Sequence, residues 1–379
     1  MQVRSLPEPF MPTTKQIKKI RDELSGKNVA PVKAPSPADL LGTGSTLLNL
    51  ACSGHPRGGF AKGGYYFFVG DSSSGKTFFS LTCLAEAAAS KRFDGYRFIY
   101  DGPEGGARMD LAKFFGSKVA ARLEAPRVED DKPQASKDIE DFYFNIDDAF
   151  KAGRPFIYIL DSMDSLSSAQ EREKADARKA FARGRTKKKP AGEYGDGKAK
   201  VNSSGIRRGL ADLRDSGSIL LILNQTRDNI GGGPFDPKKT RSGGHSLTFY
   251  ADLEMWSKVG GSLKRTVRGK ERQIGIIVKV RVKKNRQTGR DRTISVPIYW
   301  STGIDDLGGC VDFLVDERAW TKNKAGVIDA VGLGLDGTRE EIVEQIEERG
   351  LERDLRMLTA DLWREIDEAT AVKRKPRYE

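Results

Sequence analysis

The sequence predicts an α/β fold with a mostly parallel central sheet flanked by helices. Apolar runs of buried-strand length recur along the chain, and helix-permissive segments lie between several of them. A glycine-rich segment also follows the first run directly and precedes a helix-forming stretch at 78–89. The runs that we expect to form strands lie at residues 65–69, 98–100, 156–160, 219–223 and 276–282.

The length of the chain predicts appendages around one large core, because 379 residues exceed the roughly 150 of an average domain. We expect an N-terminal oligomerisation helix and linker at 1–40, a core at 41–316 and a small helical region at 317–379. Within residues 1–40, Ile17, Ile20 and Leu24 have helical spacing and are followed by a Pro- and Lys-rich linker. This apolar stripe could pack on its own core or on a neighbouring subunit.

The composition excludes several classes of protein. No apolar stretch approaches the roughly 18 residues that span a bilayer, and the N-terminus lacks the apolar run of a secretory signal. The three cysteines have no close spacing, so they fit neither a disulfide framework nor a zinc cluster. We expect a soluble cytoplasmic protein with no membrane partner.

The segment Gly70-Asp-Ser-Ser-Ser-Gly-Lys-Thr77 fits the phosphate-binding pattern G-x-x-x-x-G-K-[ST], the Walker A motif. Its glycines allow backbone N–H groups to face phosphates, Lys76 can reach the β- and γ-oxygens, and Thr77 can ligate Mg²⁺. The strand–loop–helix order places the phosphates at a helix N-terminus, which favours negative charge. An ordinary Gly/Ser turn is the alternative. We expect ATP and Mg²⁺ to be bound here by Gly70, Asp71, Ser72, Ser73, Ser74, Gly75, Lys76 and Thr77.

A carboxylate follows the run at 156–160. Asp161 stands where a P-loop ATPase places the aspartate that is associated with Mg²⁺, and we expect it to hold the ion through a water molecule. Taken alone, a strand that ends in Asp-Ser is commonplace and more often forms a turn. Its position about 85 residues after a P-loop favours the metal role.

Positive charge is concentrated in two segments of a chain whose net charge is +12. Residues 172–208 hold 13 Lys or Arg against 4 Asp or Glu, and residues 258–292 hold 13 against 2. Such segments are typical of a surface that binds a polyanion, although solvated loops are the general alternative.

The C-terminal region is acidic instead. Residues 336–368 hold 12 acidic against 5 basic residues. Thr338 and Glu341 have capping-box spacing, which predicts that a helix with an acidic face begins there.

Several further motifs follow one another in order along residues 40–315. They are Thr43-Gly-Ser-Thr-Leu-Leu-Asn-Leu50, Asp101-Gly-Pro-Glu104, Ile222-Leu-Asn-Gln225-Thr-Arg227, Ser242-Gly-Gly-His-Ser-Leu-Thr-Phe249 and Val282-Lys-Lys284-Asn-Arg286. With these motifs and the P-loop, the chain resembles the RecA family over this range. Within that family, the phage-encoded recombinases of the UvsX type are a candidate subgroup.

The resemblance implies four further catalytic residues beside Lys76. Glu104 would orient the attacking water, although its spacing from Asp101 has one residue more than the family's pattern. Gln225, which has no titratable proton, would sense the γ-phosphate. Lys284 and Arg286 would contact the ATP of an adjacent subunit. The alternatives are a solvent-exposed turn glutamate for Glu104 and an amide that caps a backbone group for Gln225. For Lys284 and Arg286 the alternative is a solvated face of a strand.

The resemblance also places DNA on two loops. The first is the basic stretch around 187–208, and the second, at 227–241, ends near Phe249, where the family relays nucleotide state between subunits. A buried core aromatic is the alternative for Phe249. The expected DNA-binding residues are Lys198, Lys200, Arg207, Arg208, Arg227, Gly231, Gly232, Lys238, Lys239 and Arg241. Adenine selectivity is open, because Leu111 and Arg108 stand where relatives offer an aromatic ring.

The leading hypothesis is a DNA-dependent ATPase that forms a helical filament on single-stranded DNA and exchanges strands with double-stranded DNA. A ring-forming motor of the replicative-helicase kind is the first alternative, and electron microscopy distinguishes a ring from a filament. A DNA-binding protein that binds ATP without hydrolysing it is the second alternative. Unchanged ATP hydrolysis in Glu104→Gln, together with loss of ATP binding in Lys76→Ala, would favour that alternative.

Overall fold

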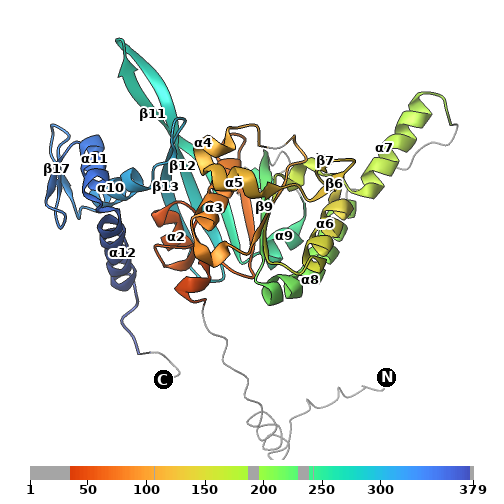
Figure 1. Cartoon of the computed structure of the whole chain (residues 1–379), viewed down its shortest axis with the longest axis horizontal. Coiled ribbons are helices and arrows are strands. Elements are labelled where there is room, and N and C mark those ends of the chain that lie inside the picture. The colour runs from red at the N-terminus through yellow and green to blue at the C-terminus, as the bar shows by residue number, and fades with distance from the viewer. Residues whose placement is uncertain (1–34, 106, 187–195, 229–238, 242, 376–379) are drawn as a thin grey trace, which may run out of the picture. The chain divides into compact units, whose positions relative to one another are not determined.

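The computed structural model describes residues 35–375 except 106, 187–195, 229–238 and 242. The predicted N-terminal helix at 1–40 therefore lies almost entirely outside the described residues. Within them, a ten-stranded sheet forms the centre of the fold (Figure 1). Its path runs β14-β13-β12-β11-β3-β9-β8-β4-β5, and β10 pairs with β9.

The middle of the sheet is parallel and includes β3 (Tyr65–Gly70), β4 (Arg97–Asp101), β8 (Phe156–Leu160), β9 (Ile219–Asp228) and the start of β11 (Leu253–Val267). Short β5 (Leu123–Glu124) extends this parallel part. The other side is antiparallel, with β12 (Lys270–Asn285), β13 (Arg292–Tyr299) and β14 (Gly303–Ile304). The fold is therefore the predicted α/β class, with a RecA-like core.

Both faces of the sheet are covered by helices, which explains why the strands are apolar throughout. On one face, Tyr66 and Phe68 pack with α2 (Thr46–Ser53), α3 (Lys76–Ala88) and α5 (Ser117–Arg122). On the other, Tyr65, Phe67 and Val69 pack with α6 (Ile139–Lys151), α8 (Asp196–Ser216) and α9 (His245–Tyr250). Because successive side chains of β3 alternate between these two clusters, none of them faces water.

Every strand predicted from an apolar run is present, in β3, β4, β8, β9 and β12. The sequence missed β11 and β13, because exposed polar residues interrupt their apolar ones. Much of the second basic segment belongs to the long hairpin of β11 and β12. The helix predicted at 78–89 is α3, which begins two residues earlier, at Lys76.

The C-terminal part combines α10 (Asp306–Asp316), α11 (Arg339–Arg349) and α12 (Glu352–Ala369) around its own hydrophobic cluster. Thr338 and Glu341 form the predicted capping box at the start of α11. A small antiparallel sheet of β15 (Thr321–Lys322), β16 (Ile328–Ala330) and β17 (Leu335–Gly337) was not predicted, because its strands have only two or three residues. No helix among the described residues is long and apolar enough to cross a membrane.

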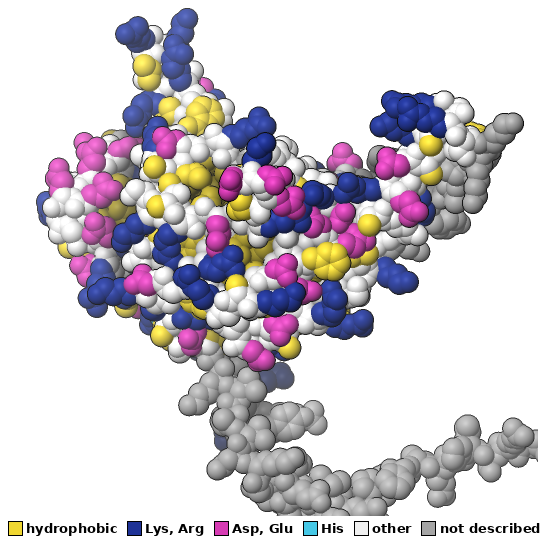
Figure 2. All heavy atoms as spheres, turned by 45° about the vertical axis from the view of Figure 1, so that its right-hand side comes forward, with side chains coloured by type: hydrophobic (Ala, Val, Ile, Leu, Met, Phe, Trp, Pro, Cys, Tyr) yellow, Lys and Arg dark blue, Asp and Glu magenta, His cyan; other side chains and the backbone are white. Residues whose placement is uncertain are grey.

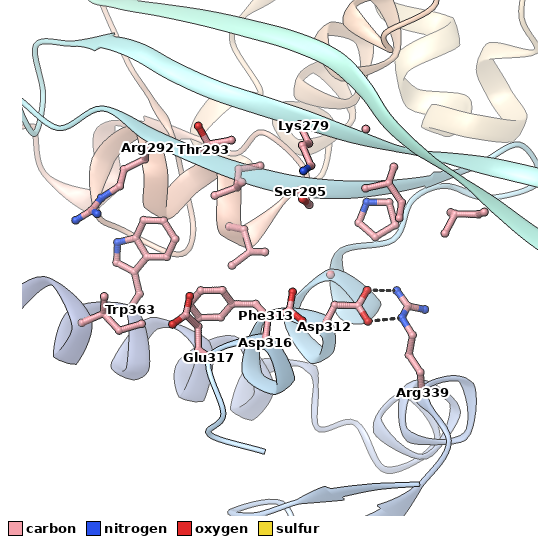
Figure 3. A pocket seen from close by; sticks show the side chains of 18 of the residues that line it. Lys279, Arg292, Thr293, Ser295, Asp312, Phe313, Asp316, Glu317, Arg339 and Trp363 are labelled. Carbon is pink, nitrogen blue, oxygen red and sulfur yellow. Dashed lines mark hydrogen bonds and ion pairs between the residues drawn. The ribbon is translucent and has the colours of Figure 1, made fainter. Parts of the chain in front are cut away.

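A cavity of about 670 Å³ lies between this C-terminal part and the antiparallel strands (Figure 3). Lys279, Thr293 and Ser295 line it from the strands, and Asp312 and Trp363 line it from the helices. Arg339 anchors its rim, since its guanidinium donates to both carboxylate oxygens of Asp312 at 2.8 and 2.9 Å. The cavity is separate from the glycine-rich loop, because none of residues 70–77 lines it.

The base of the hairpin gives a test of the fold. A Cβ added at Gly275 would lie 2.3 Å from the carbonyl oxygen of Ile298 on β13, so the two strands would have to separate. We expect Gly275→Ala to lower the free energy of unfolding by about 1–3 kcal/mol, the usual effect of overpacking. Urea denaturation measures it, with Gly95→Ala as the control, since a Cβ at Gly95 meets no atom within 4 Å. Equal stability of the two variants would contradict the β12–β13 register.

Candidate nucleotide site

The glycine-rich loop connects buried β3 to α3 in the predicted strand–loop–helix order. Gly70 ends the strand where a Cβ would lie 2.1 Å from the hydroxyl of Ser257 and 2.6 Å from that of Ser74. Gly75 has a φ of 81°, a left-handed conformation that disfavours other residues, and it precedes the helix directly. The loop therefore curls tightly and points the N-terminus of α3 into its own concave side.

Lys76 lies inside this curl and is only 8% exposed. Its ammonium donates hydrogen bonds to the backbone oxygens of Gly70 at 2.9 Å and Asp71 at 2.8 Å. Burial lowers the pKa of Lys76, while the negative charges of Asp161, Asp71 and Glu104 oppose that shift. The ammonium has two neutral carbonyl partners here, and a ligand with anionic oxygens could replace them.

Asp161 follows β8 and lies beside the start of α3. Thr77 donates its hydroxyl hydrogen to Asp161 Oδ2 at 2.5 Å, and the Tyr100 hydroxyl donates to the same oxygen at 2.9 Å. The structure therefore brings together the two residues that the sequence assigned to Mg²⁺. Tyr100 was not predicted, because an aromatic residue in a buried strand gives no sign that its hydroxyl reaches a carboxylate.

Asp101, at the end of β4, is fully buried and fixes the start of the Glu104 segment. Its carboxylate accepts hydrogen bonds from the Ser136 backbone N–H at 2.8 Å and the Tyr158 hydroxyl at 2.7 Å. Burial raises the pKa of Asp101, and these donors oppose the rise. Its own carbonyl oxygen accepts from the Asp161 N–H at 2.8 Å, which ties the ends of β4 and β8 together.

Glu104 and Gln225 meet above this edge of the sheet. Gln225 Nε2 donates to Glu104 Oε1 at 3.3 Å, and the Ser162 hydroxyl donates to the same oxygen at 2.6 Å. These side chains come from the segments after β4 and β8 and from β9, so the fold joins residues that are 121 positions apart. The extra residue before Glu104 does not keep it from the candidate site.

Asp71 links the glycine-rich loop to the segment after β9. Its Oδ1 accepts hydrogen bonds from the Thr226 hydroxyl and from Lys239 Nζ, the latter at 2.6 Å. Lys239 belongs to β10 (Lys239–Arg241), which pairs with the end of β9. Although burial alone would raise it, hydrogen bonds from Lys239 and Thr226 lower the pKa of Asp71. A predicted DNA-binding lysine is thus in direct contact with a predicted nucleotide-binding residue.

The other predicted DNA-binding residues differ in their surroundings. Lys198 and Arg227 both contact Asp164, through its backbone oxygen at 3.3 Å and its carboxylate at 2.9 Å. Arg241 is turned inward: its side chain is 13% exposed and pairs with the buried Glu254 at 3.2 Å. Lys200, Arg207 and Arg208 are exposed on α8. Gly231, Gly232 and Lys238 lie outside the described residues.

Lys284 lies near the end of β12, Arg286 directly follows that strand, and both side chains cap the C-terminus of α9. Lys284 Nζ donates to the backbone oxygens of Thr248 and Phe249 at 2.6 and 2.7 Å, and Arg286 donates to the latter at 2.7 Å. Cations are favourable at this end of a helix. Burial, and then the charge of Arg286, lower the pKa of Lys284. Phe249 is 65% exposed beside them, so it is not a buried core aromatic.

A parallel sheet with a glycine-rich loop at its carboxyl edge defines the class of this protein, an α/β protein with a RecA-like core. Residues 186–305 match the family model of the RecA N-terminal domain. Proteins named RecA are similar over most of the chain. That of Methylococcus capsulatus is 26% identical over 334 residues, 86% of this chain and 84% of the relative. That of Caulobacter sp. strain K31 is 27% identical over 300 residues, 77% and 70% of the two chains. The chain is therefore similar to RecA proteins over most of its length, and this likeness agrees with the RecA-like core.

The Asp71–Lys239 pair can be tested directly. Removal of the lysine charge in Lys239→Gln should raise the pKa of the Asp71 carboxyl, because it removes both a hydrogen bond and a nearby cation. Folding lowers the pKa of Asp71, so the pair stabilises the fold at any pH above the pKa that Asp71 has in the unfolded chain. This stabilisation is lost as the pH falls through the pKa that Asp71 has in the folded chain. NMR titration of the carboxyl carbon measures the shift, with the exposed Lys258→Gln as the control. An unchanged pKa of Asp71 in Lys239→Gln would contradict the contact between Asp71 and Lys239.

Proposed function

We propose that this protein is an ATP-dependent recombinase. It forms a filament on single-stranded DNA and exchanges strands with double-stranded DNA. The observation that carries the proposal is the meeting of Glu104 and Gln225 beside the Lys76 curl and the Thr77–Asp161 pair. This edge therefore holds an acceptor for a water proton, a neutral amide and a cationic cradle for phosphate. The RecA relatives support it, at identities of 25–27%.

The first step that we infer is phosphate binding by the glycine-rich loop. The backbone N–H groups of the curl and the positive end of α3 favour an anion. Lys76 exchanges its bonds to the Gly70 and Asp71 carbonyl oxygens for bonds to phosphate oxygens, which are stronger because both partners are charged. Desolvation of the ammonium is thus offset when the triphosphate is bound.

Thr77 and Asp161 fit a magnesium site, because both offer hard oxygen ligands and Thr77 Oγ1 already lies 2.5 Å from Asp161 Oδ2. Thr77 would hold the ion through its hydroxyl oxygen and Asp161 through a water molecule, and the ion would supply positive charge beside the phosphates. Tyr100 holds Asp161 in place through the 2.9 Å hydrogen bond to Oδ2.

Glu104 orients the attacking water and accepts its proton in the hydrolysis that we propose. Its exposed carboxylate is held by Ser162 and Gln225, which fix Oε1 and leave Oε2 for the water. Gln225 has donor and acceptor atoms but no titratable proton. It therefore detects the terminal phosphate without taking part in proton transfer, and β9 carries its movement to the following loop.

The Asp71–Lys239 contact couples the nucleotide to DNA in this proposal. Negative phosphates in the curl make the surroundings of Asp71 more anionic, and DNA phosphates compete for Lys239. Occupation of either site alters the 2.6 Å pair that joins the two. The exposed cations Lys200, Arg207 and Arg208 of α8, with Arg227 near the end of β9, then neutralise the DNA backbone.

Subunit contact completes the site that we propose. Lys284 and Arg286 donate to the carbonyls of α9 and lie with exposed Phe249 on one surface patch. Lys284 pairs with Glu254 near the start of β11, whereas Gly70 of the P-loop pairs with Ser257 farther along that strand, so the two cations suit the phosphates of an adjacent subunit. A contact between this patch and the P-loop edge is heterologous and does not close by twofold symmetry, which allows a filament.

Lys76→Ala tests the nucleotide site. We expect it to abolish ATP binding and hydrolysis, because no other group within the described curl supplies a buried cation. ATPase rates with and without single-stranded DNA should be measured on the chain and on Lys91→Ala, an exposed control. Electron microscopy of the same mixtures distinguishes filaments from rings. Turnover unchanged by Lys76→Ala would refute the site, and rings would favour the motor.

Glu104→Gln separates hydrolysis from binding. The amide keeps its hydrogen bonds but cannot accept the water proton, so we expect the ATPase rate to fall about 10²- to 10⁴-fold. ATP binding, and DNA binding in the presence of ATP, should persist. Turnover at the original rate would mean that another group activates the water.

A further inference from the structure

The β11–β12 hairpin extends beyond the sheet at the edge that carries the candidate nucleotide site. β11 runs parallel to β3 only from Leu253 to Ser257, where Ser257 pairs with Gly70. From there it continues to Val267, and within the described part of the chain this stretch pairs only with β12. On the other side β12 pairs with β13 only over residues 275–282. The outer end is therefore a free two-stranded ribbon, which projects from the molecule in Figure 1.

This ribbon end is strongly basic. Its exposed cations are Lys264, Arg265, Arg268, Lys270 and Arg272, and its one carboxylate, Glu271, pairs with Lys264 at 2.7 Å. Among the described residues, no ion pair involves the other four cations. Arg265 also borders an open cavity toward α11, but the nearby glutamates there form no ion pair with it. Figure 2 shows Lys and Arg side chains covering the projecting end.

The arrangement of these cations is unfavourable for the isolated chain. Arg265 and Arg272 are direct cross-strand partners, and like charges in that position destabilise a sheet. Arg268 occupies the turn with a φ of 52°, a conformation that is uncommon for residues other than glycine, asparagine and aspartate. Neither feature strengthens the hairpin. Both bring guanidinium groups together at its tip, where an anion would relieve the repulsion.

The chemistry of the ribbon favours the backbone of duplex DNA as the anion. Side chains on one face of a strand repeat at about 6.8 Å, so the cations form a linear array. A two-stranded ribbon also fits the major groove, which is about 12 Å wide. Residues 258–274 hold no aromatic side chain. Single-strand binding and protein interfaces usually depend on such rings, so both fit less well.

We propose that the hairpin tip binds the phosphates of double-stranded DNA, at a site separate from the two predicted DNA loops. Arg265, Arg268, Lys270 and Arg272 are the contacts. The inference adds a second DNA surface to the proposed function, and it rests on the charges of the ribbon, not on ATP hydrolysis. Because ribbon and P-loop share one edge of the sheet, the duplex would lie near the strand held by the loops.

The test compares two triple variants of the full chain. Arg268→Gln, Lys270→Gln and Arg272→Gln together remove charge from the tip. Arg318→Gln, Lys322→Gln and Lys324→Gln are the matched control, since these residues are exposed and Arg318 also has a positive φ, 62°. Fluorescence anisotropy with a 30-base-pair duplex, without nucleotide and over a range of salt concentrations, measures affinity.

We expect the tip variant to bind the duplex at least 10-fold more weakly than the control, with a salt slope lower by about 2–3, because three phosphate contacts are lost. ATPase stimulation by single-stranded DNA should be unchanged. Should the chain prove to have no ATPase activity, the loss of duplex binding would still be measurable, so the two proposals fail separately.

Two results would overturn the proposal. One is duplex affinity and salt slope equal to those of the control. The other is a selective loss of single-stranded DNA or of an acidic polypeptide such as polyglutamate. Arg268→Gly is a second variant that removes a tip charge without disturbing the turn, because glycine adopts the positive φ at no steric cost. It should weaken duplex binding without lowering the urea midpoint, and unchanged binding in this folded variant would count against the tip.

Discussion

The parallel register of four strands is the constraint on which the candidate site depends. Gly70 pairs with Gln225, Leu160 pairs with Ile222, and Asp101 pairs with Leu160. Carboxyl ends that share one edge necessarily bring their following residues together. A slip of one residue in any pair would turn the buried side chains of a strand to the wrong cluster, so core packing fixes the geometry of the polar edge.

Burial also explains where polar groups can lie. Covered on both faces, the strands hold few polar side chains until they reach their ends, where hydrogen-bond partners become available. Asp101 illustrates the condition: a carboxylate with no exposed surface is retained only because donors from β8 and from Ser136 surround it. The chemistry at this edge is therefore held by the same core that makes the strands apolar.

The sequence predicted those parts of the site that a local pattern specifies. Lys76, Thr77 and Asp161 follow from a loop and a strand end, and Gln225 from an ordered set of motifs. The hydroxyl of Tyr100 and the Asp71–Lys239 pair could not be predicted, because these contacts depend on which strands become neighbours. Arg241 is a related case: this basic residue of a predicted DNA loop pairs with buried Glu254, a partner that its neighbours in sequence do not reveal.

The free ribbon has a consequence for how this protein can diverge. Among the residues that the structure describes, its outer residues pair only with each other. Two residues added to each strand would therefore extend it by about 6.8 Å and keep every side chain on its face. The parallel strands would be untouched. Insertions can thus adjust the length of the ribbon in small steps without changing the edge that carries the candidate nucleotide site. An engineer could use the same position to attach a probe or a tether.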